Sequence, residues 1–200
     1  MEKSFKKVIE GYKKFRQKYA NDDESIMHNL SQHGQTPKIM VVACCDSRVD
    51  PALILQCDPG DLFVVRNVAN IVPNFEKDDA HHGTSAALEF AICFLKVKHL
   101  ILLGHSQCGG IQARLDASSL GKNDFISNWV SSIVIDDNKI TVDACAKIGL
   151  KQSYEHCLTF PWIHEKVDNE ELFIHTWFFD IKAGKIFTYC KDHNQYNELE

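Results

Sequence analysis

The sequence lacks any long run of apolar residues. A membrane-spanning helix needs about 20 consecutive apolar residues, and no segment of this 200-residue chain approaches that length. The first residues, Met1 to Lys7, are charged and have no apolar centre of the kind found in secretory signals. We therefore expect a cytoplasmic location and no membrane partner.

The chain also lacks an excess of basic residues. It carries 22 lysines and arginines against 27 aspartates and glutamates, a formal net charge of -5. Proteins that bind nucleic acid concentrate positive charge against the phosphates. We therefore expect no nucleic-acid partner.

No Cys-x-x-Cys pair occurs among the eight cysteines, although that spacing is the signature of thiol redox proteins. A disulfide framework is not indicated either, because such frameworks are typical of short secreted domains. No internal repeat, low-complexity tract or linker is visible. The chain is thus expected to form one domain with a sizeable core.

Two polar motifs stand where apolar segments end. Residues 44–48, Cys-Cys-Asp-Ser-Arg, follow the apolar segment 39–43, and residues 105–110, His-Ser-Gln-Cys-Gly-Gly, follow the apolar segment 100–103. Open α/β sheets keep their active sites where parallel strands end and loops begin. We therefore expect both motifs at one edge of a sheet.

Together the motifs offer metal ligands. Cys44 and Cys108 supply thiolates and His105 supplies an imidazole, a ligand set that selects Zn²⁺ over Mg²⁺ or Ca²⁺. Three protein ligands leave one position open for water, which separates a catalytic zinc from a structural one. Cys44 and Cys45 are not both expected on one metal, because successive side chains of an extended segment point to opposite faces.

The order of the remaining segments predicts an α/β fold. Strands that alternate with helices favour a central parallel sheet with helices on both faces. The expected strands are residues 38–43, 62–65 and 99–103 with a closing pair at 171–180 and 185–189, and the expected helices are residues 2–20, 51–57, 82–97, 125–135 and 141–158.

The two motifs resemble the signature of the β-class carbonic anhydrases, C-x-D-S-R followed at a distance by H-x-x-C-G-G. The likeness extends over residues 59–70, 83–89 and 172–189. It covers almost the whole chain beyond its first helix and points to the plant-type active site. The resemblance selects Cys44, rather than Cys45, as the ligand.

The resemblance implies one domain with the β-carbonic anhydrase fold. That fold is a central, mostly parallel β-sheet flanked by helices, with an N-terminal helical arm and a C-terminal strand pair. On this pattern the arm covers residues 1–34, the zinc-binding core covers residues 35–120, and helices and closing strands cover residues 121–200.

A reaction and a cofactor follow from the same resemblance. One Zn²⁺ per subunit would be held by Cys44, His105 and Cys108, and zinc-bound hydroxide would attack CO₂ to give bicarbonate and a proton. Asp46 would accept a hydrogen bond from the hydroxide, and Arg48 would keep Asp46 ionised and aimed. Taken without the ligand motif, Asp46 and Arg48 are typical of a surface ion pair; the motif favours a catalytic dyad.

Five positions match residues that line the CO₂ pocket in the family. They are Gln35, Phe63, Val68, Phe90 and Gly110. Gln35 and Phe63 would approach from a neighbouring subunit. Phe90 stands where plant-type members usually have a tyrosine, so a hydroxyl contact near the metal is expected to be lost.

The segment of residues 2–20 predicts an amphipathic helix. Apolar and aromatic residues recur at helical spacing on one face, with lysines elsewhere. Such a stripe fits either a membrane surface or a protein partner, and its several aromatic side chains favour a protein. In the resembled family this helix packs on a neighbouring subunit, which implies a homodimer or a higher oligomer.

The sequence also offers candidates for a proton relay and for parts of a regulatory site. His81 and His82 are relay candidates, because they precede a helix near the site in the family layout and histidine titrates near neutral pH; a pair of solvated loop histidines is the more ordinary interpretation.

Some bacterial members bind bicarbonate at a second site made of a tryptophan, an arginine and a tyrosine. Only Arg66 is retained here, with Val41 at the tryptophan position and residues 178–179, both Phe, near the tyrosine position. We therefore expect no bicarbonate-driven switch.

Other functions share parts of this pattern. Enzymes that act on COS or CS₂ use the same scaffold and ligands, and the sequence separates these substrates from CO₂ poorly. A structural or zinc-buffering protein would need a fourth protein ligand, and the dyad of Asp46 and Arg48 argues against that class. The absence of Cys-x-x-Cys makes a thiol redox protein the weakest alternative.

Overall fold

One six-stranded sheet forms the centre of the computed structural model, which describes residues 2–116, 124–136 and 139–200. The strand order is β2-β1-β3-β4-β5-β6, in which the first four strands run parallel and the last two antiparallel. The predicted α/β class with a mostly parallel sheet is confirmed. The strands are β1 (Ile39–Cys44), β2 (Leu62–Asn67), β3 (His99–His105), β4 (Phe173–Asp180), β5 (Lys185–Cys190) and β6 (Gln195–Glu198).

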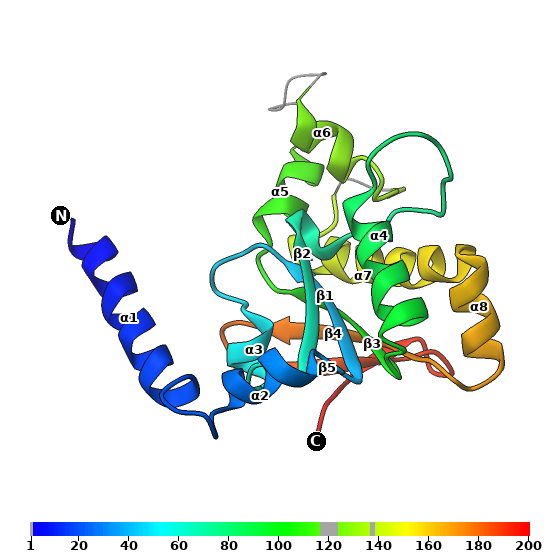
Figure 1. The fold of residues 1–200 in the computed structure, drawn as a ribbon. Helices are drawn as coiled ribbons and strands as arrows, with labels where there is room; N and C mark the ends of the chain where they lie inside the picture. Colours follow the sequence, from blue (N-terminus) through cyan, green and yellow to red (C-terminus); the bar gives the residue numbers. More distant parts are fainter. Residues whose placement is uncertain (1, 117–123, 137–138) are drawn as a thin grey trace.

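Helices flank this sheet. Figure 1 shows α4, α7 and α8 on one side of the sheet, α2 and α3 on the other, and α1 standing apart from the rest of the chain. The helices are α1 (Lys3–Tyr19), α2 (Ile26–His33), α3 (Pro51–Ile54), α4 (Gly83–Glu89), α5 (Gly109–Leu115), α6 (Phe125–Val130), α7 (Val142–Thr159) and α8 (Pro161–Asp168), with the short turns η1 (Val68–Asn70) and η2 (Phe90–Phe94). Among the described residues, no helix is long and apolar enough to cross a membrane.

Several elements differ from the sequence-based prediction. The helix expected over residues 82–97 ends at Glu89 and continues as the π turn η2, and the helix expected over residues 125–135 ends at Val130. The closing strand pair is present, but β4 joins the parallel strands and β6 adds a third strand. Helices α2 and α8 were not expected, and the proposed boundary between residues 120 and 121 lies outside the described residues.

The central strand β1 is buried on both faces, as expected for a parallel sheet. Met40, Val42 and Cys44 point to the larger core, and Val41 and Ala43 point to a smaller cluster on the opposite face. Each of these five residues is at most 4% exposed. Alternation along the strand therefore places the sulfur of Cys44 at the end of β1 on the side of the larger core.

Candidate metal centre

The two sequence motifs meet at the ends of neighbouring strands. Strand β1 ends at Cys44, strand β3 ends at His105, and the two strands run parallel with Ala43 opposite Leu103. Cys108 follows in the loop after β3 and stands at the position just before α5. The carboxyl ends of the two central strands thus bring all three side chains to one point, the place where open α/β sheets bind ligands.

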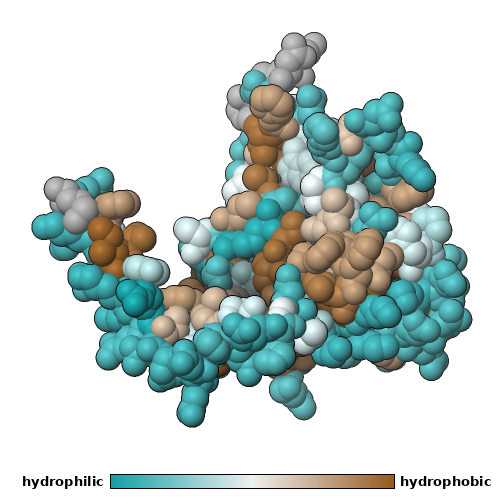
Figure 2. Space-filling model, in the orientation of Figure 1, coloured by the Kyte–Doolittle hydropathy of each residue, from teal (hydrophilic) through white to brown (hydrophobic). Residues whose placement is uncertain are grey.

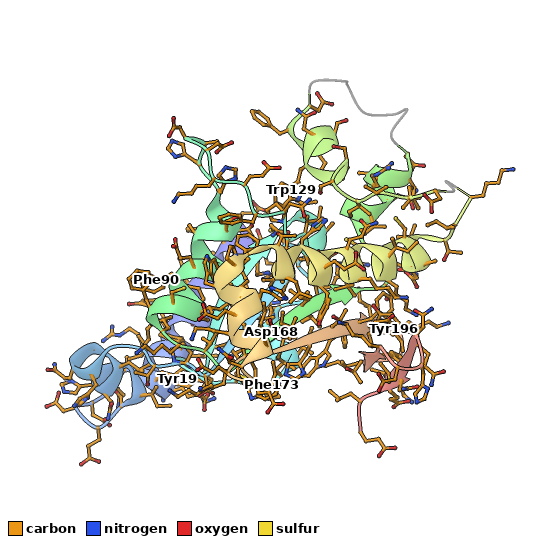
Figure 3. The ribbon with its side chains drawn as sticks, turned by 90° about the vertical axis from the view of Figure 1, so that its right-hand side faces the viewer. Tyr19, Phe90, Trp129, Asp168, Phe173 and Tyr196 are labelled. Atoms are coloured by element: carbon orange, nitrogen blue, oxygen red, sulfur yellow. The ribbon has the colours of Figure 1, made fainter. Side chains whose placement is uncertain are left out.

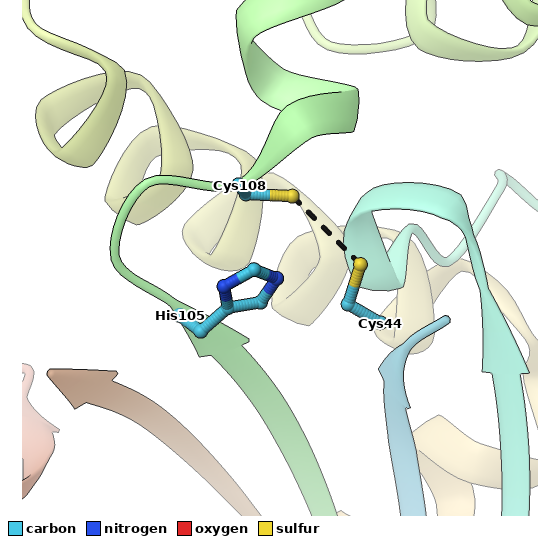
Figure 4. Close-up of side chains that lie close together, drawn as sticks. All are labelled: Cys44, His105 and Cys108. Atoms are coloured by element: carbon cyan, nitrogen blue, oxygen red, sulfur yellow. Dashed lines mark hydrogen bonds between the residues drawn. The ribbon is translucent and has the colours of Figure 1, made fainter. Parts of the chain in front are cut away.

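Cys44, His105 and Cys108 form one compact cluster (Figure 4). One potential ligand atom from each lies within 4.8 Å of the others, and all three residues are buried. The two sulfurs are 3.8 Å apart. Two sulfurs and one nitrogen at this spacing can bind one metal ion from three sides.

The imidazole of His105 is oriented for ligation. Its Nδ1 lies 2.9 Å from the carbonyl oxygen of Ser106, and a carbonyl only accepts, so Nδ1 carries the proton. Nε2 then presents a lone pair, yet it is completely buried and has no hydrogen-bond partner. A buried nitrogen without a partner is costly in a folded protein unless something binds it. A metal ion fits this requirement.

The two thiols affect each other's ionisation. A hydrogen bond from Cys108 lowers the pKa of Cys44 to about 4. The same hydrogen bond is the main cause that raises the pKa of Cys108 above its ordinary value, and burial raises it further. Without a cation the pair therefore favours a single shared proton, whereas a bound divalent cation stabilises two thiolates.

Asp46 and Arg48 form a paired dyad beside the cluster. Arg48 Nε and Nη2 donate to the two carboxylate oxygens of Asp46 at 2.9 and 2.6 Å, and the backbone N–H of Arg48 donates to Oδ1 at 2.9 Å. These hydrogen bonds hold the pKa of Asp46 well below its usual range, and those from the side chain of Arg48 have the largest effect. Asp46 Oδ2 lies 4.0 Å from Nε2 of His105. An ionised carboxylate therefore borders the open side of the cluster.

Arg66 holds the segment that carries Cys44. Its Nε donates to the carbonyl of Cys44 at 2.9 Å, Nη2 to the carbonyl of Asp46 at 2.8 Å, and Nη1 to the carboxylate of Asp50 at 2.8 Å. Asp50 in turn caps α3 by accepting from the N–H groups of Ala52 and Leu53. The sequence predicts Arg66 only as the remnant of an anion site, because its backbone partners leave no signal in the sequence.

An apolar pocket of about 560 Å³ is lined in part by Cys45, the residue that follows Cys44 in the chain. Val68 lines it, and a Cβ on Gly110 would lie only 2.5 Å from Val68 Cγ1, so this close packing requires the glycine. Figure 3 shows Trp129 projecting from α6, and its Nε1 donates to the carbonyl of Val68 at 2.7 Å. The other lining residues, which the sequence analysis missed, are Cys45, Asn67, Phe125 and Ile126.

Phe63 and Phe90 do not line this pocket, and their rings contact each other. Their ring centroids are 5.8 Å apart, and Figure 3 shows Phe90 projecting outward at the end of α4. Phe63 pairs with Met40 in the sheet, four residues before Cys44, which corresponds to about 13 Å along the strand. Gln35 is exposed and precedes the same end of β1. Within one chain these three predicted pocket residues are therefore separated from the metal cluster, unlike Val68 and Gly110.

His81 and His82 lie in the loop before α4. His81 is exposed, and Nε2 of His82 lies 2.6 Å from the carboxylate of Asp78. His82 and Asp78 line a separate pocket of about 400 Å³, together with Glu89 and Trp162. The structure thus pairs His82 with a carboxylate rather than with a member of the metal cluster.

Comparisons with known proteins agree with this geometry. The family model described as carbonic anhydrase matches residues 39–186. A carbonic anhydrase of Synechocystis is 33% identical over 195 residues, which cover 92% of this chain and 70% of that protein. A chloroplastic β-carbonic anhydrase of Arabidopsis thaliana is 39% identical over 177 residues, and the match covers 82% of this chain and 57% of the plant protein.

Solved structures show the same fold. The β-carbonic anhydrase CcaA superposes with a TM-score of 0.88 at 30% identity and covers 98% of this chain and 100% of its own. A tetrameric β-carbonic anhydrase of Sordaria macrospora superposes with a TM-score of 0.78 at 30% identity, over 94% of this chain and 97% of its own. With the family model, the sequence relatives and the fold in agreement, the chain belongs to the β-class carbonic anhydrases.

Proposed function

We propose that this protein catalyses the reversible hydration of CO₂ to bicarbonate and a proton, with one Zn²⁺ per subunit held by Cys44, His105 and Cys108. The observation that carries the proposal is the buried, unpartnered Nε2 of His105 beside two thiol sulfurs. Sulfur and imidazole donors favour zinc over magnesium or calcium. Among the described residues this group contains three metal-binding side chains, which favours an open catalytic site over a closed structural one.

The residues around the cluster have separate tasks. Zinc, when bound, supplies a water that ionises near neutral pH. Asp46 accepts a hydrogen bond from the nucleophile, because a carboxylate kept ionised by Arg48 has only acceptor oxygens. Both oxygens of Asp46 are occupied by Arg48, which favours this orienting role over ligation of the metal. The apolar wall at Val68 suits a small apolar substrate.

The product proton must leave the site for solvent. His81 and His82 remain our candidates for this relay, since histidine titrates near neutral pH and the loop before α4 is open to solvent. The pairing of His82 with Asp78 lowers the pKa of Asp78 and keeps a negative charge beside the imidazole. That arrangement supports His82, more than His81, as the group that holds the proton.

We also propose that the active form is a homodimer or a higher oligomer. Phe63, Phe90 and Gln35 lie away from the cluster of their own chain, which supports a role for them in lining the site of another copy. Figure 2 shows hydrophobic surface in the middle of one face, over β2 and α4, and on α1. The tetrameric relative of Sordaria macrospora supports such an assembly. A cytoplasmic location stays a prediction, since one relative is chloroplastic.

Stopped-flow measurement of CO₂ hydration tests the proposed reaction. Asp46→Ala should lower kcat by about 10²-fold while zinc stays bound, because an orienting acceptor is lost. Cys108→Ser should lose both zinc and activity. Asp168→Ala is the matched control, since this exposed aspartate pairs with His164 on α8, and it should keep the full rate. Equal rates in all four proteins would exclude the mechanism.

A further inference from the structure

The loop between the second and third ligands has an unusual backbone. Gln107, which directly precedes Cys108, has a φ of 53° and lies in the left-handed region that residues other than glycine seldom adopt. Such a conformation persists only where the surroundings hold it in place. The contacts of Gln107 show what holds it.

Both polar backbone groups of Gln107 are bound by side chains. Its N–H donates to Oδ1 of Asp143 at 2.8 Å. Its carbonyl accepts from Nη2 of Arg48 at 3.0 Å. Asp143 lies in the first turn of α7, a helix that packs against β3 and is capped by Thr141. A carboxylate on a packed helix therefore fixes the peptide that receives the guanidinium of Arg48.

We propose that Asp143 is a positioning residue for the dyad of Asp46 and Arg48. By holding the N–H of Gln107, Asp143 orients the Gln107 carbonyl toward Arg48. That carbonyl is the second anchor of the guanidinium, whose first anchor is the carboxylate of Asp46. This inference deepens the proposed hydration reaction and rests on it.

Arg48 needs a second anchor because of its exposure. Its side chain is 44% exposed, whereas that of Asp46 is 16% exposed. A long, half-exposed side chain samples several rotamers unless it is held at more than one point. Nη2 of Arg48 donates both to Asp46 Oδ2 at 2.6 Å and to the Gln107 carbonyl at 3.0 Å. Because one nitrogen serves both, a displaced Gln107 peptide would shift the direction in which Asp46 points.

Three single variants test the proposal by stopped-flow hydration of CO₂ on the zinc-loaded full chain. Asp143→Ala should lower kcat about tenfold, because the dyad loses its alignment. Asp143→Asn keeps an acceptor oxygen and should recover at least half of the wild-type rate. Thr141→Ala removes the cap of the same helix but leaves Gln107 untouched, so it should hydrate CO₂ at the wild-type rate.

The decisive comparison is a double-mutant cycle with Arg48→Ala. If Asp143 acts through Arg48, then adding Asp143→Ala to Arg48→Ala should cause no further loss of rate. Zinc content and the thermal midpoint of the metal-free protein are the readouts that do not depend on activity. Zinc content should stay at one per chain in both Asp143 variants, and the midpoint of Asp143→Asn should match the wild type.

Three results would overturn the proposal. They are a wild-type rate in Asp143→Ala, a rate in Asp143→Asn as low as in Asp143→Ala, and a double variant whose loss equals the product of the two single losses. An inactive, zinc-loaded wild-type protein would instead contradict the proposed hydration reaction. The failure of the inference and the failure of the proposed function are therefore distinguishable.

Discussion

Arg66 shows how a single residue links the site to the sheet. Its guanidinium joins the backbone carbonyls of Cys44 and Asp46 to the carboxylate of Asp50. The retained arginine could be recognised in the sequence, but its partners could not, because two of them are main-chain carbonyls 20 and 22 residues away. With these donors occupied, Arg66 is engaged in holding the segment that carries Cys44, and the lack of a bicarbonate-driven switch stays a prediction.

Replacing Arg66 should therefore weaken both fold and function. Arg66→Gln removes donors from two partly buried carbonyls and should lower the free energy of unfolding by about 1–3 kcal/mol, with a lower CO₂ hydration rate. Urea unfolding and stopped-flow assays measure the two effects. Arg114→Gln is the control, because within the described part of the chain Arg114 donates to one carbonyl, that of Ile133, and it should cost less stability. A wild-type rate and stability in Arg66→Gln would show that these hydrogen bonds do not matter.

Some residues of the site could be predicted from the sequence, and others could not. The clustering of Cys44, His105 and Cys108, with Asp46 and Arg48 beside them, was predictable because each motif directly follows an apolar strand. Trp129 and Asp143 were not, since they come from α6 and α7 and act through single hydrogen bonds to backbone atoms. Phe63 and Phe90 were predicted from the resemblance alone, and the role that we propose for them needs a second chain.

At the scale of secondary structure, the parallel strands followed from their apolar runs, but shorter elements did not. Helix α2 has a serine cap at Ser25 and is followed by Gly34, with a φ of 72°, signals that mark the ends of a helix but were not used in the prediction. Helix α8 begins with Pro161, a favourable first helical residue. Strand β6 is polar and, among the described strands, pairs with β5 alone, so alternation of apolar residues could not reveal it.

Neighbouring strands β3 and β4 carry a pair of histidines that predicts a pH dependence. His99 Nδ1 lies 3.0 Å from His175 Nε2, so one ring donates and the other must be neutral to accept. Burial is the main cause that lowers the pKa of His175, and the nearby His99 lowers it further. As pH falls, the unfolded chain binds this proton before the folded one does, so the stability from a neutral His175 is present above pH of about 6.5 and is lost below it.

Urea unfolding at pH 7.5 and 5.5 measures this effect. The loss of unfolding free energy between the two values should be smaller in His175→Gln than in the wild type. His164→Gln serves as the control, because His164 is 59% exposed, and its loss should equal that of the wild type. If His175→Gln and the wild type lose the same amount, the histidine pair has no part in acid sensitivity.

At the scale of the whole molecule, one chain leaves hydrophobic surface uncovered. Helix α1 stands away from the sheet, with Phe5 57%, Val8 66% and Tyr12 59% exposed (Figure 1). The helical spacing predicted the stripe from the sequence, whereas its partner is not encoded in any local pattern. An apolar stripe of this kind is typical of a protein interface.

Charges placed on this stripe should break the assembly. The double variant Phe5→Asp and Tyr12→Asp should sediment as a monomer and lose most of its hydration activity, because residues such as Phe63 no longer reach another chain's pocket. Lys14→Asp, on the polar side of α1, should sediment like the wild type. Analytical ultracentrifugation measures this, and an unchanged oligomer in the double variant would place the interface elsewhere.

The most direct test of the account is zinc X-ray absorption spectroscopy on the purified wild-type protein, with its metal content measured in parallel. The account predicts one zinc per chain, with two sulfur ligands, one imidazole nitrogen and one lighter ligand from solvent. A folded, active protein without zinc, or a zinc bound by three or more sulfurs, would contradict it.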